Sequence, residues 1–169
     1  AIPKVTSGTV FSGAFVVNIS NTLKSTKFGY PCTKKPVSFQ GSYKYTPGAT
    51  YYYCADPTKA NEVKEDNSKT DAPAINAVLY EVDSYAFDFL DGTNLQTSEK
   101  IVAKASLKDE SAKASYTDFN IDFEWGSNKF DPAKKYKLAI VCSSSKDGDK
   151  FSGAPGSVLY VDDLKVTFE

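Results

Sequence analysis

The stretch KYKLAIVCSSSKDGDKFSGAPGSVLYVDDLKVTFE, residues Lys135–Glu169, reads as a strand, a loop and a second strand. In the first strand every second side chain falls on one face, which carries Tyr136, Leu138, Ile140 and Cys142. A period of two residues is typical of a strand with a buried face. The loop, residues 146–156, is rich in Gly, Asp and Pro, which favour turns. We therefore predict two strands of a β-sheet at the end of the chain.

The final strand, Ser157–Glu169, alternates in the same way, with one exception. Its buried face is expected to carry Val158, Tyr160, Leu164, Val166 and Phe168. In this register Asp162 falls on the same face, and Asp163 follows it. A carboxylate turned into a core is costly unless it is hydrogen-bonded or bound to a metal ion. Asp162 is therefore expected either to accept hydrogen bonds from amides or serines, or to bind calcium.

Composition excludes several classes of function. The chain has 169 residues, which suit one domain over residues 1–169, and a formal net charge of −1. That charge favours neither nucleic acid nor a membrane surface as a partner, and no apolar run is long enough to insert into a membrane. All twenty basic residues are lysines, and histidine is absent. A Ser-His-Asp triad and a histidine-based zinc site are therefore excluded.

The rest of the chain also predicts strands. Alternating or apolar segments cover residues 9–19, 37–46, 76–82, 100–107 and 116–125. Residues 9–19 are apolar on both faces and are expected to be covered on both sides. No segment has a sustained helical period, so two sheets must cover each other. The predicted fold is an all-β, two-sheet jelly-roll β-sandwich.

Two features of the chain are open to more than one interpretation. Asp56–Thr70 is strongly charged and is expected to form a mobile surface loop, of the kind that often borders binding sites. Cys142 lies on the apolar face of its strand and is expected to be a buried thiol. Cys32 and Cys54 both lie beside turns, and either a disulfide between them or two separate thiols is consistent with the sequence.

Three stretches together resemble a known family. They are FQGSYKYTPG (Phe39–Gly48), INAVLYEVD (Ile75–Asp83) and IVCSSSKDGDKFSGAPGSVLYVDDLKV (Ile140–Val166). In this order they are similar to the putative carbohydrate metabolism domain family of surface and exported gut-bacterial proteins, from about Gly13 onward. The family is similar to β-jelly-roll carbohydrate-binding modules. The resemblance implies a polysaccharide or oligosaccharide partner and a periplasmic or cell-surface location. It also implies a monomeric domain of a larger exported chain, but it supplies no catalytic mechanism.

The cleanest alternation in the chain provides the candidate sugar site. One face carries Asp118, Asn120, Asp122 and Glu124, and the other carries Phe119, Ile121, Phe123 and Trp125. A row of hydrogen-bonding side chains suits a hydroxyl-rich ligand, although it is equally typical of a solvated sheet face. Asp122 and Glu124 would form the carboxylate pair of a glycosidase. Their spacing of about 6.7 Å follows from strand geometry alone and does not discriminate between these functions.

Three aromatic residues are candidates for stacking on sugar rings: Trp125, Tyr51 and Tyr53. Trp125 shares a face with apolar residues, so a role in the core is the alternative. Jelly-roll carbohydrate-binding modules often hold a structural calcium near their terminal strands. The resemblance therefore favours calcium at Asp162, completed by carbonyls of the first strand. Asp147-Gly148-Asp149 resembles half of a calcium loop but lacks the remaining EF-hand spacing.

The sequence therefore predicts non-catalytic carbohydrate binding by an exported jelly-roll domain. A glycoside hydrolase using a carboxylate pair is the first alternative. A structural or adhesive spacer domain without a sugar site is the second.

Overall fold

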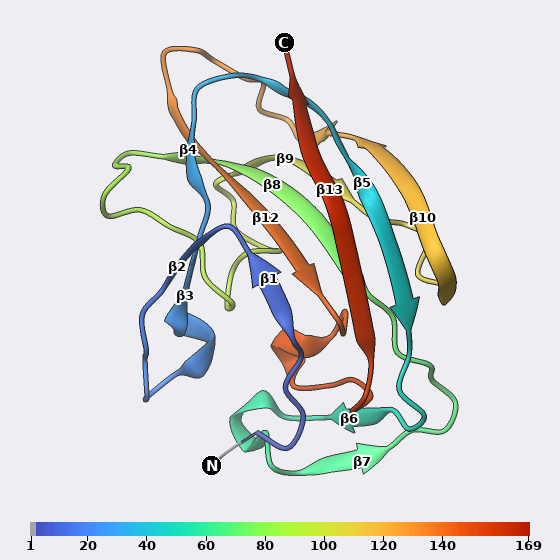
Figure 1. Cartoon of the computed structure of the whole chain (residues 1–169). Coiled ribbons are helices and arrows are strands. Elements are labelled where there is room, and N and C mark those ends of the chain that lie inside the picture. The colour runs from blue at the N-terminus through green and yellow to red at the C-terminus, as the bar shows by residue number, and fades with distance from the viewer. Residues whose placement is uncertain (1–2) are drawn as a thin grey trace.

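A computed structural model describes residues 3–169 as an all-β fold in which two antiparallel sheets are stacked (Figure 1). This confirms the predicted sandwich. The larger sheet has the order β1 (Thr9–Phe11), β12 (Lys135–Ser143), β8 (Ala74–Val82), β9 (Ile101–Ser106) and β11 (Glu124–Trp125), and β4 (Tyr30–Cys32) also pairs with β12. The smaller sheet has the order β10 (Lys113–Asp122), β5 (Pro36–Thr46) and β13 (Val158–Phe168).

Two separate strand pairs and three short 3₁₀ helices complete the part of the chain that the structure describes. The strand pairs join β2 (Gly13–Phe15) to β3 (Thr26–Phe28) and β6 (Tyr52–Cys54) to β7 (Val63–Glu65). The 3₁₀ helices are η1 (Thr22–Ser25), η2 (Pro57–Lys59) and η3 (Gly148–Lys150). The charged stretch Asp56–Thr70 is therefore not a plain loop, because it contains η2 and a strand.

The N-terminal segment differs from its prediction. Within residues 9–19 only β1 and β2 are strands, and the chain breaks between them at Ser12, so that β1 joins the larger sheet while β2 pairs with β3. Gly13 allows this turn: its φ is 143°, and a Cβ there would lie 2.1 Å from the carbonyl oxygen of Lys27. Beyond the break the apolar residues are exposed, with Val17 at 71% and Ile19 at 91%. The prediction that they are covered on both sides was wrong.

The main core lies between the two sheets. Tyr136, Leu138, Ile140 and Cys142 of β12 contribute to it, as the alternation predicted. From the smaller sheet, Phe39 and Phe119 pack edge to face with ring centroids 5.2 Å apart. Gly41 lies under this pair, because a Cβ there would come within 2.9 Å of the Phe119 ring and 2.8 Å of Leu164.

The larger sheet is also covered on its other face. Ala139 and Val141 of β12 join Val78 and Tyr80 of β8 in a second cluster, which Phe28 and Leu90 close from outside the sheet. The Tyr80 hydroxyl donates a hydrogen bond to the carbonyl of Phe28. The central strands β8 and β12 are therefore buried on both faces, which explains their nearly continuous apolar sequences.

The register of β13 is a correction to the sequence prediction. Asp163 has a φ of 52°, and the pairing with β5 shifts between Asp162 and Lys165, which marks a β-bulge. Before the bulge, Leu159 and Val161 face the core, whereas Tyr160 and Asp162 face solvent. After the bulge Leu164 and Val166 face inward as predicted. Val158 and Phe168 are exposed at 40% and 43%, the latter after a second register shift.

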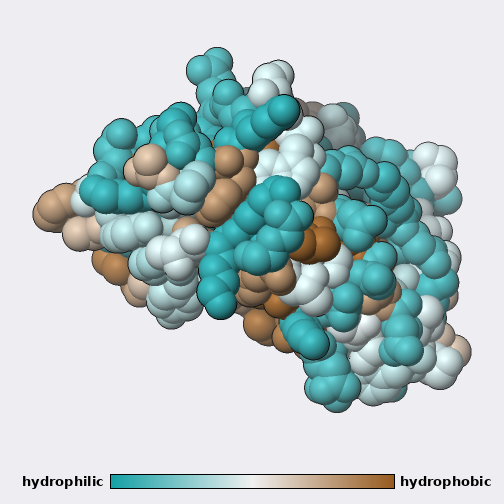
Figure 2. All heavy atoms as spheres, turned by 90° about the horizontal axis from the view of Figure 1, so that it is seen from above, coloured by the Kyte–Doolittle hydropathy of each residue, from teal (hydrophilic) through white to brown (hydrophobic). Residues whose placement is uncertain are grey.

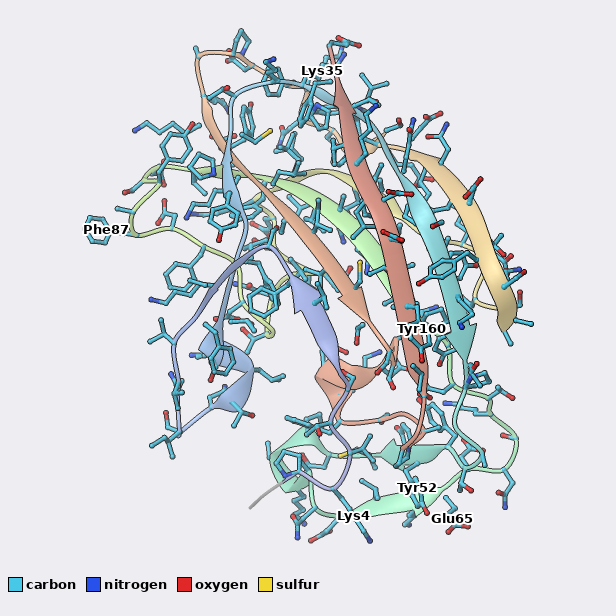
Figure 3. The ribbon with its side chains drawn as sticks, in the orientation of Figure 1. Lys4, Lys35, Tyr52, Glu65, Phe87 and Tyr160 are labelled. Carbon is cyan, nitrogen blue, oxygen red and sulfur yellow. The ribbon has the colours of Figure 1, made fainter. Side chains whose placement is uncertain are left out.

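The remaining sequence predictions have mixed outcomes. All three cysteines are buried free thiols, so Cys142 is as predicted and Cys32 and Cys54 are not paired. Among residues 3–169, no helix has the length and apolarity needed to cross a membrane. Figure 2 shows a largely hydrophilic surface with apolar side chains in small groups, some near the middle of the view and some at the left end, the side on which Figure 3 places the exposed Phe87.

Candidate functional site

The smaller sheet presents one side to the core and the other to solvent; we call its solvent side the outer face. Strand pairing sets Asp118 of β10, Ser42 of β5 and Asp162 of β13 in one row across this face. The next row is Asn120, Gln40 and Lys165. With strands about 4.8 Å apart, the outer members of a row are about 10 Å apart at the backbone. The fold therefore extends the predicted polar row into a sheet of hydrogen-bonding groups three strands wide.

Two exposed tyrosines lie at one end of the outer face. Tyr160 is 48% exposed and lies opposite Lys44 on the neighbouring strand. The ammonium nitrogen of Lys44 is 4.5 Å from the centroid of the Tyr160 ring. Tyr116 is 51% exposed, and its ring centroid lies 6.0 Å from the same nitrogen. Figure 3 shows Tyr160 on β13, beside the strands of the same sheet. A lysine therefore stands between two aromatic rings at the end of the polar rows.

The predicted residues Asp118, Asn120 and Asp122 all lie exposed on the outer face, on β10. Tyr116, Tyr160 and Lys44 were missed as site residues. The alternation in β5 already placed Lys44 on a polar face. Tyr160 was missed because the register put Asp162 inward. The adjacent carboxylates Asp162 and Asp163 could have indicated the true register of this strand. If Asp162 faces solvent, Tyr160 does so too, because residues two apart on a strand share a face.

Glu124 does not belong to this row of polar side chains. After Asp122 the chain leaves the smaller sheet, and Glu124 pairs with Lys104 at the edge of the larger one. Its Oε1 accepts a hydrogen bond from Lys108 Nζ at 2.5 Å. Asp122 and Glu124 thus belong to different sheets, and Glu124 is engaged in an exposed ion pair.

The predicted stacking residues lie outside the smaller sheet, which carries Tyr116 and Tyr160. Trp125 packs against the core and edge to face on Phe130, with centroids 6.5 Å apart, in keeping with the core alternative. Tyr51 is buried, and its hydroxyl donates to Asp147 Oδ2 at 3.1 Å. Burial, reinforced by the Asp147 carboxylate, raises the pKa of Tyr51 well above its usual range. Tyr53 is 44% exposed beside Lys69 and remains accessible.

Asp162 does not have the surroundings predicted for a calcium ligand. Its carboxylate is exposed, and Oδ1 accepts a hydrogen bond from the amide of Asp163 at 2.8 Å. The first strand, which was expected to supply carbonyl ligands, pairs with β12 and not with β13. Across residues 3–169, no three Cys, Asp or Glu side chains are grouped to hold a metal ion. These residues do not fit a shell of six to eight oxygens, so calcium remains a prediction without geometric support.

The family of the chain follows from sequence comparison. Residues 1–167 match the model of the putative carbohydrate metabolism domain, and the chain belongs to this family. The resemblance noted in its strands is thereby confirmed. No curated protein matches the chain.

The solved structures that are similar to it include two whose sequences are more than 30% identical to it. One is a putative glycoside hydrolase from Bacteroides thetaiotaomicron VPI-5482, with 35% identity, a TM-score of 0.83 and coverage of 96% of this chain. The other is a putative glycoside hydrolase from Bacteroides vulgatus ATCC 8482, with 32% identity, a TM-score of 0.77 and the same coverage. The chain spans 47% of the first protein and 65% of the second.

Proposed function

We propose that this domain binds a polysaccharide without cleaving it, and that the bound polysaccharide lies along the outer face. The observation that carries the proposal is the row of Tyr116, Lys44 and Tyr160, which continues into the rows of Asp118 and Asn120. Membership of a carbohydrate-related family supplies the ligand class. As the sequence predicted, we place the domain in a larger exported protein of the periplasm or cell surface.

The chemistry of a sugar chain matches this surface. A pyranose ring has apolar C–H faces, which pack on aromatic rings, and hydroxyl groups around its edge. Tyr116 and Tyr160 offer aromatic surface with a polar tip, and they lose little conformational freedom when they bind. Carboxylates and amides such as Asp118 and Asn120 accept and donate hydrogen bonds to the hydroxyls. A sheet face with both kinds of group therefore suits an extended polysaccharide chain.

Hydrolysis is the second candidate function, favoured by the description of both similar structures as putative glycoside hydrolases. A glycosidase holds its general acid in a sheltered pocket that favours the protonated form. Asp118, Asp122 and Glu124 are all exposed, and they lie on the outer face or the adjoining sheet edge. This placement favours binding over cleavage.

A glycan array followed by affinity electrophoresis in polysaccharide gels tests the proposal. We expect retention by at least one polysaccharide, and Tyr116→Ala and Tyr160→Ala should each weaken it. Tyr85→Ala is the matched control, since Tyr85 is also an exposed tyrosine but lies outside the smaller sheet. Undiminished retention of both outer-face variants would contradict the proposed site. Release of new reducing ends that stops in Asp122→Asn would favour the hydrolase instead.

A further inference from the structure

A cleft of about 640 Å³ opens on the side of the sandwich opposite the outer face. Its size falls within the range of about 300–1,000 Å³ that is usual for small-molecule sites. Its floor is the larger sheet, where Thr9 pairs with Ser143, and Asn76 pairs with both Val141 and Ser106.

Alternation along the strands places this floor away from the core. Ile75, Ala77 and Cys142 face the smaller sheet and are buried in the main core. The residues next to them along the strands, such as Asn76 and Val141, must point to the other side of the sheet. The whole thickness of the sandwich therefore separates the cleft from Tyr116 and Tyr160.

The walls of the cleft are three segments that lie far apart in the sequence. They are η1 with Thr26, residues 92–97, and residues 145–151 with η3; the blue and orange coils in Figure 1 are η1 and η3. Two walls are joined directly, because the Gly92 amide donates to the Leu23 carbonyl at 2.9 Å. A Cβ on Gly92 would lie 2.8 Å from that oxygen, so only glycine allows this approach.

The wall at residues 92–97 is held in shape by its own hydrogen bonds. The amide of Asp91 donates to Asn94 Oδ1 at 2.8 Å, and the amide of Thr93 donates to Asp91 Oδ1 at 2.8 Å. Leu95 anchors the segment in the second apolar cluster. The cleft is therefore preformed, which lowers the entropic cost of binding.

The lining combines neutral polar groups with apolar surface. Asn76, Gln96 and Ser106 offer amides and a hydroxyl, and Leu23, Leu107 and Val141 offer apolar contact. Four of the five charged side chains are paired: Glu110 forms an ion pair with Lys146, and Lys150 Nζ lies 2.8 Å from Asp147 Oδ1. The fifth is the carboxylate of Asp149, which would repel an anionic ligand. A lining with apolar patches, neutral hydrogen-bonding groups and largely compensated charge matches an uncharged sugar better than an anionic one.

We propose that this cleft is a second carbohydrate site, which binds the end of a short neutral oligosaccharide. The inference goes beyond the proposed function, because it needs no binding at the outer face. It shares only the carbohydrate context of the family. A domain with both sites would engage two glycan segments from opposite sides.

Amide NMR titration of the ¹⁵N-labelled chain tests the proposal. The probes are the methyl glycosides of glucose, galactose, mannose and N-acetylglucosamine, with maltotriose and methyl glucuronoside. We expect at least one neutral sugar to shift signals of Asn76, Gln96 and Ser106 while those of Tyr116 and Tyr160 stay in place. Methyl glucuronoside should bind more weakly than the best neutral probe.

Variants separate the two sites. The nearly isosteric Asn76→Leu and the smaller Ser106→Ala should each weaken sugar binding in the cleft by about tenfold, as expected for a lost hydrogen bond. Both should leave polysaccharide retention at the outer face unchanged, and Tyr160→Ala should leave the cleft unchanged. If no probe shifts the cleft signals, if the shifts occur only around Tyr116 and Tyr160, or if glucuronoside binds best, the proposal is wrong.

Discussion

Lys44 and Tyr160 lie directly opposite each other on β5 and β13, and the ammonium nitrogen is 4.5 Å from the ring centroid. An exposed cation–π contact of this kind contributes about 0.5–1 kcal/mol. It gives a contact to an exposed aromatic ring on an edge strand. Because Tyr116 lies near the same ammonium group, one lysine positions both rings of the outer face.

Substitutions of Tyr160 should distinguish stacking from hydrogen bonding. We expect Tyr160→Phe to keep most of the affinity for the retained polysaccharide, because the ring remains. Tyr160→Ala should weaken binding about tenfold or more, in line with the energy of an aromatic contact. Isothermal titration calorimetry measures both. An equal loss in both variants would show that the hydroxyl and not the ring carries binding.

The exposure of the C-terminal end of β13 can be checked by stability. Leu164 packs over Gly41 in the main core, so Leu164→Ala should lower the free energy of unfolding by about 1–3 kcal/mol. Phe168→Ala should cost less, about 1 kcal/mol, because 43% of its surface is exposed. Urea denaturation gives both values. A larger loss for Phe168→Ala than for Leu164→Ala would mean that Phe168 lies in the core, as the sequence predicted.

Asp71 is a buried carboxylate that joins three loop segments. Its Oδ2 accepts hydrogen bonds from Ser145 Oγ at 2.7 Å, Ser157 Oγ at 2.7 Å and the Ala154 amide at 2.8 Å. We expect Asp71→Ala to destabilise the fold by about 3–5 kcal/mol, because it leaves buried donors without an acceptor. Asp66→Ala, at a surface turn, is the control and should change the urea midpoint little. If Asp71→Ala left the stability unchanged, water would have to replace the carboxylate as the hydrogen-bond acceptor.

The protein should lose stability in alkali. Burial raises the pKa of Tyr45 and of Tyr80 to about 12, from an ordinary value of about 10. Between these values the folded state binds more protons than the unfolded state, so stability is full below pH 10 and falls as the pH rises through 12. Each tyrosine accounts for up to roughly 2–3 kcal/mol. Unfolding midpoints in urea across this range, with ultraviolet titration of tyrosinate, measure the effect. A flat stability profile would contradict it.

The cysteines should be unreactive in the folded protein. Burial raises the pKa of the Cys142 thiol to about 12 and also raises that of Cys32, which suppresses the reactive thiolate. We expect slow labelling of both by a thiol reagent in native buffer and rapid labelling of all three cysteines in denaturant. Mass spectrometry without reductant checks the count. A Cys32–Cys54 crosslink would contradict the structure.

Local patterns in the sequence were sufficient for much of the fold. The alternation in β12 identified Tyr136, Leu138, Ile140 and Cys142 as core residues, and that in β10 separated Phe119 from Asp118. Such patterns succeed because neighbouring side chains of a strand point to opposite faces, whatever the strand pairs with. The same regularity placed Asp118, Asn120 and Asp122 together on the outer face.

Only the tertiary structure decided the features that depend on pairing between distant segments. A single bulge at Asp163 moves Tyr160 and Asp162 to the solvent side, because one extra residue reverses every side chain before it. The change of sheet after Asp122 separates Glu124 from its row. The cleft over Asn76 exists because Gly92 meets Leu23, some seventy positions away along the sequence. The sequence by itself determined which residues were available to each face, whereas long-range pairing decided which of them met.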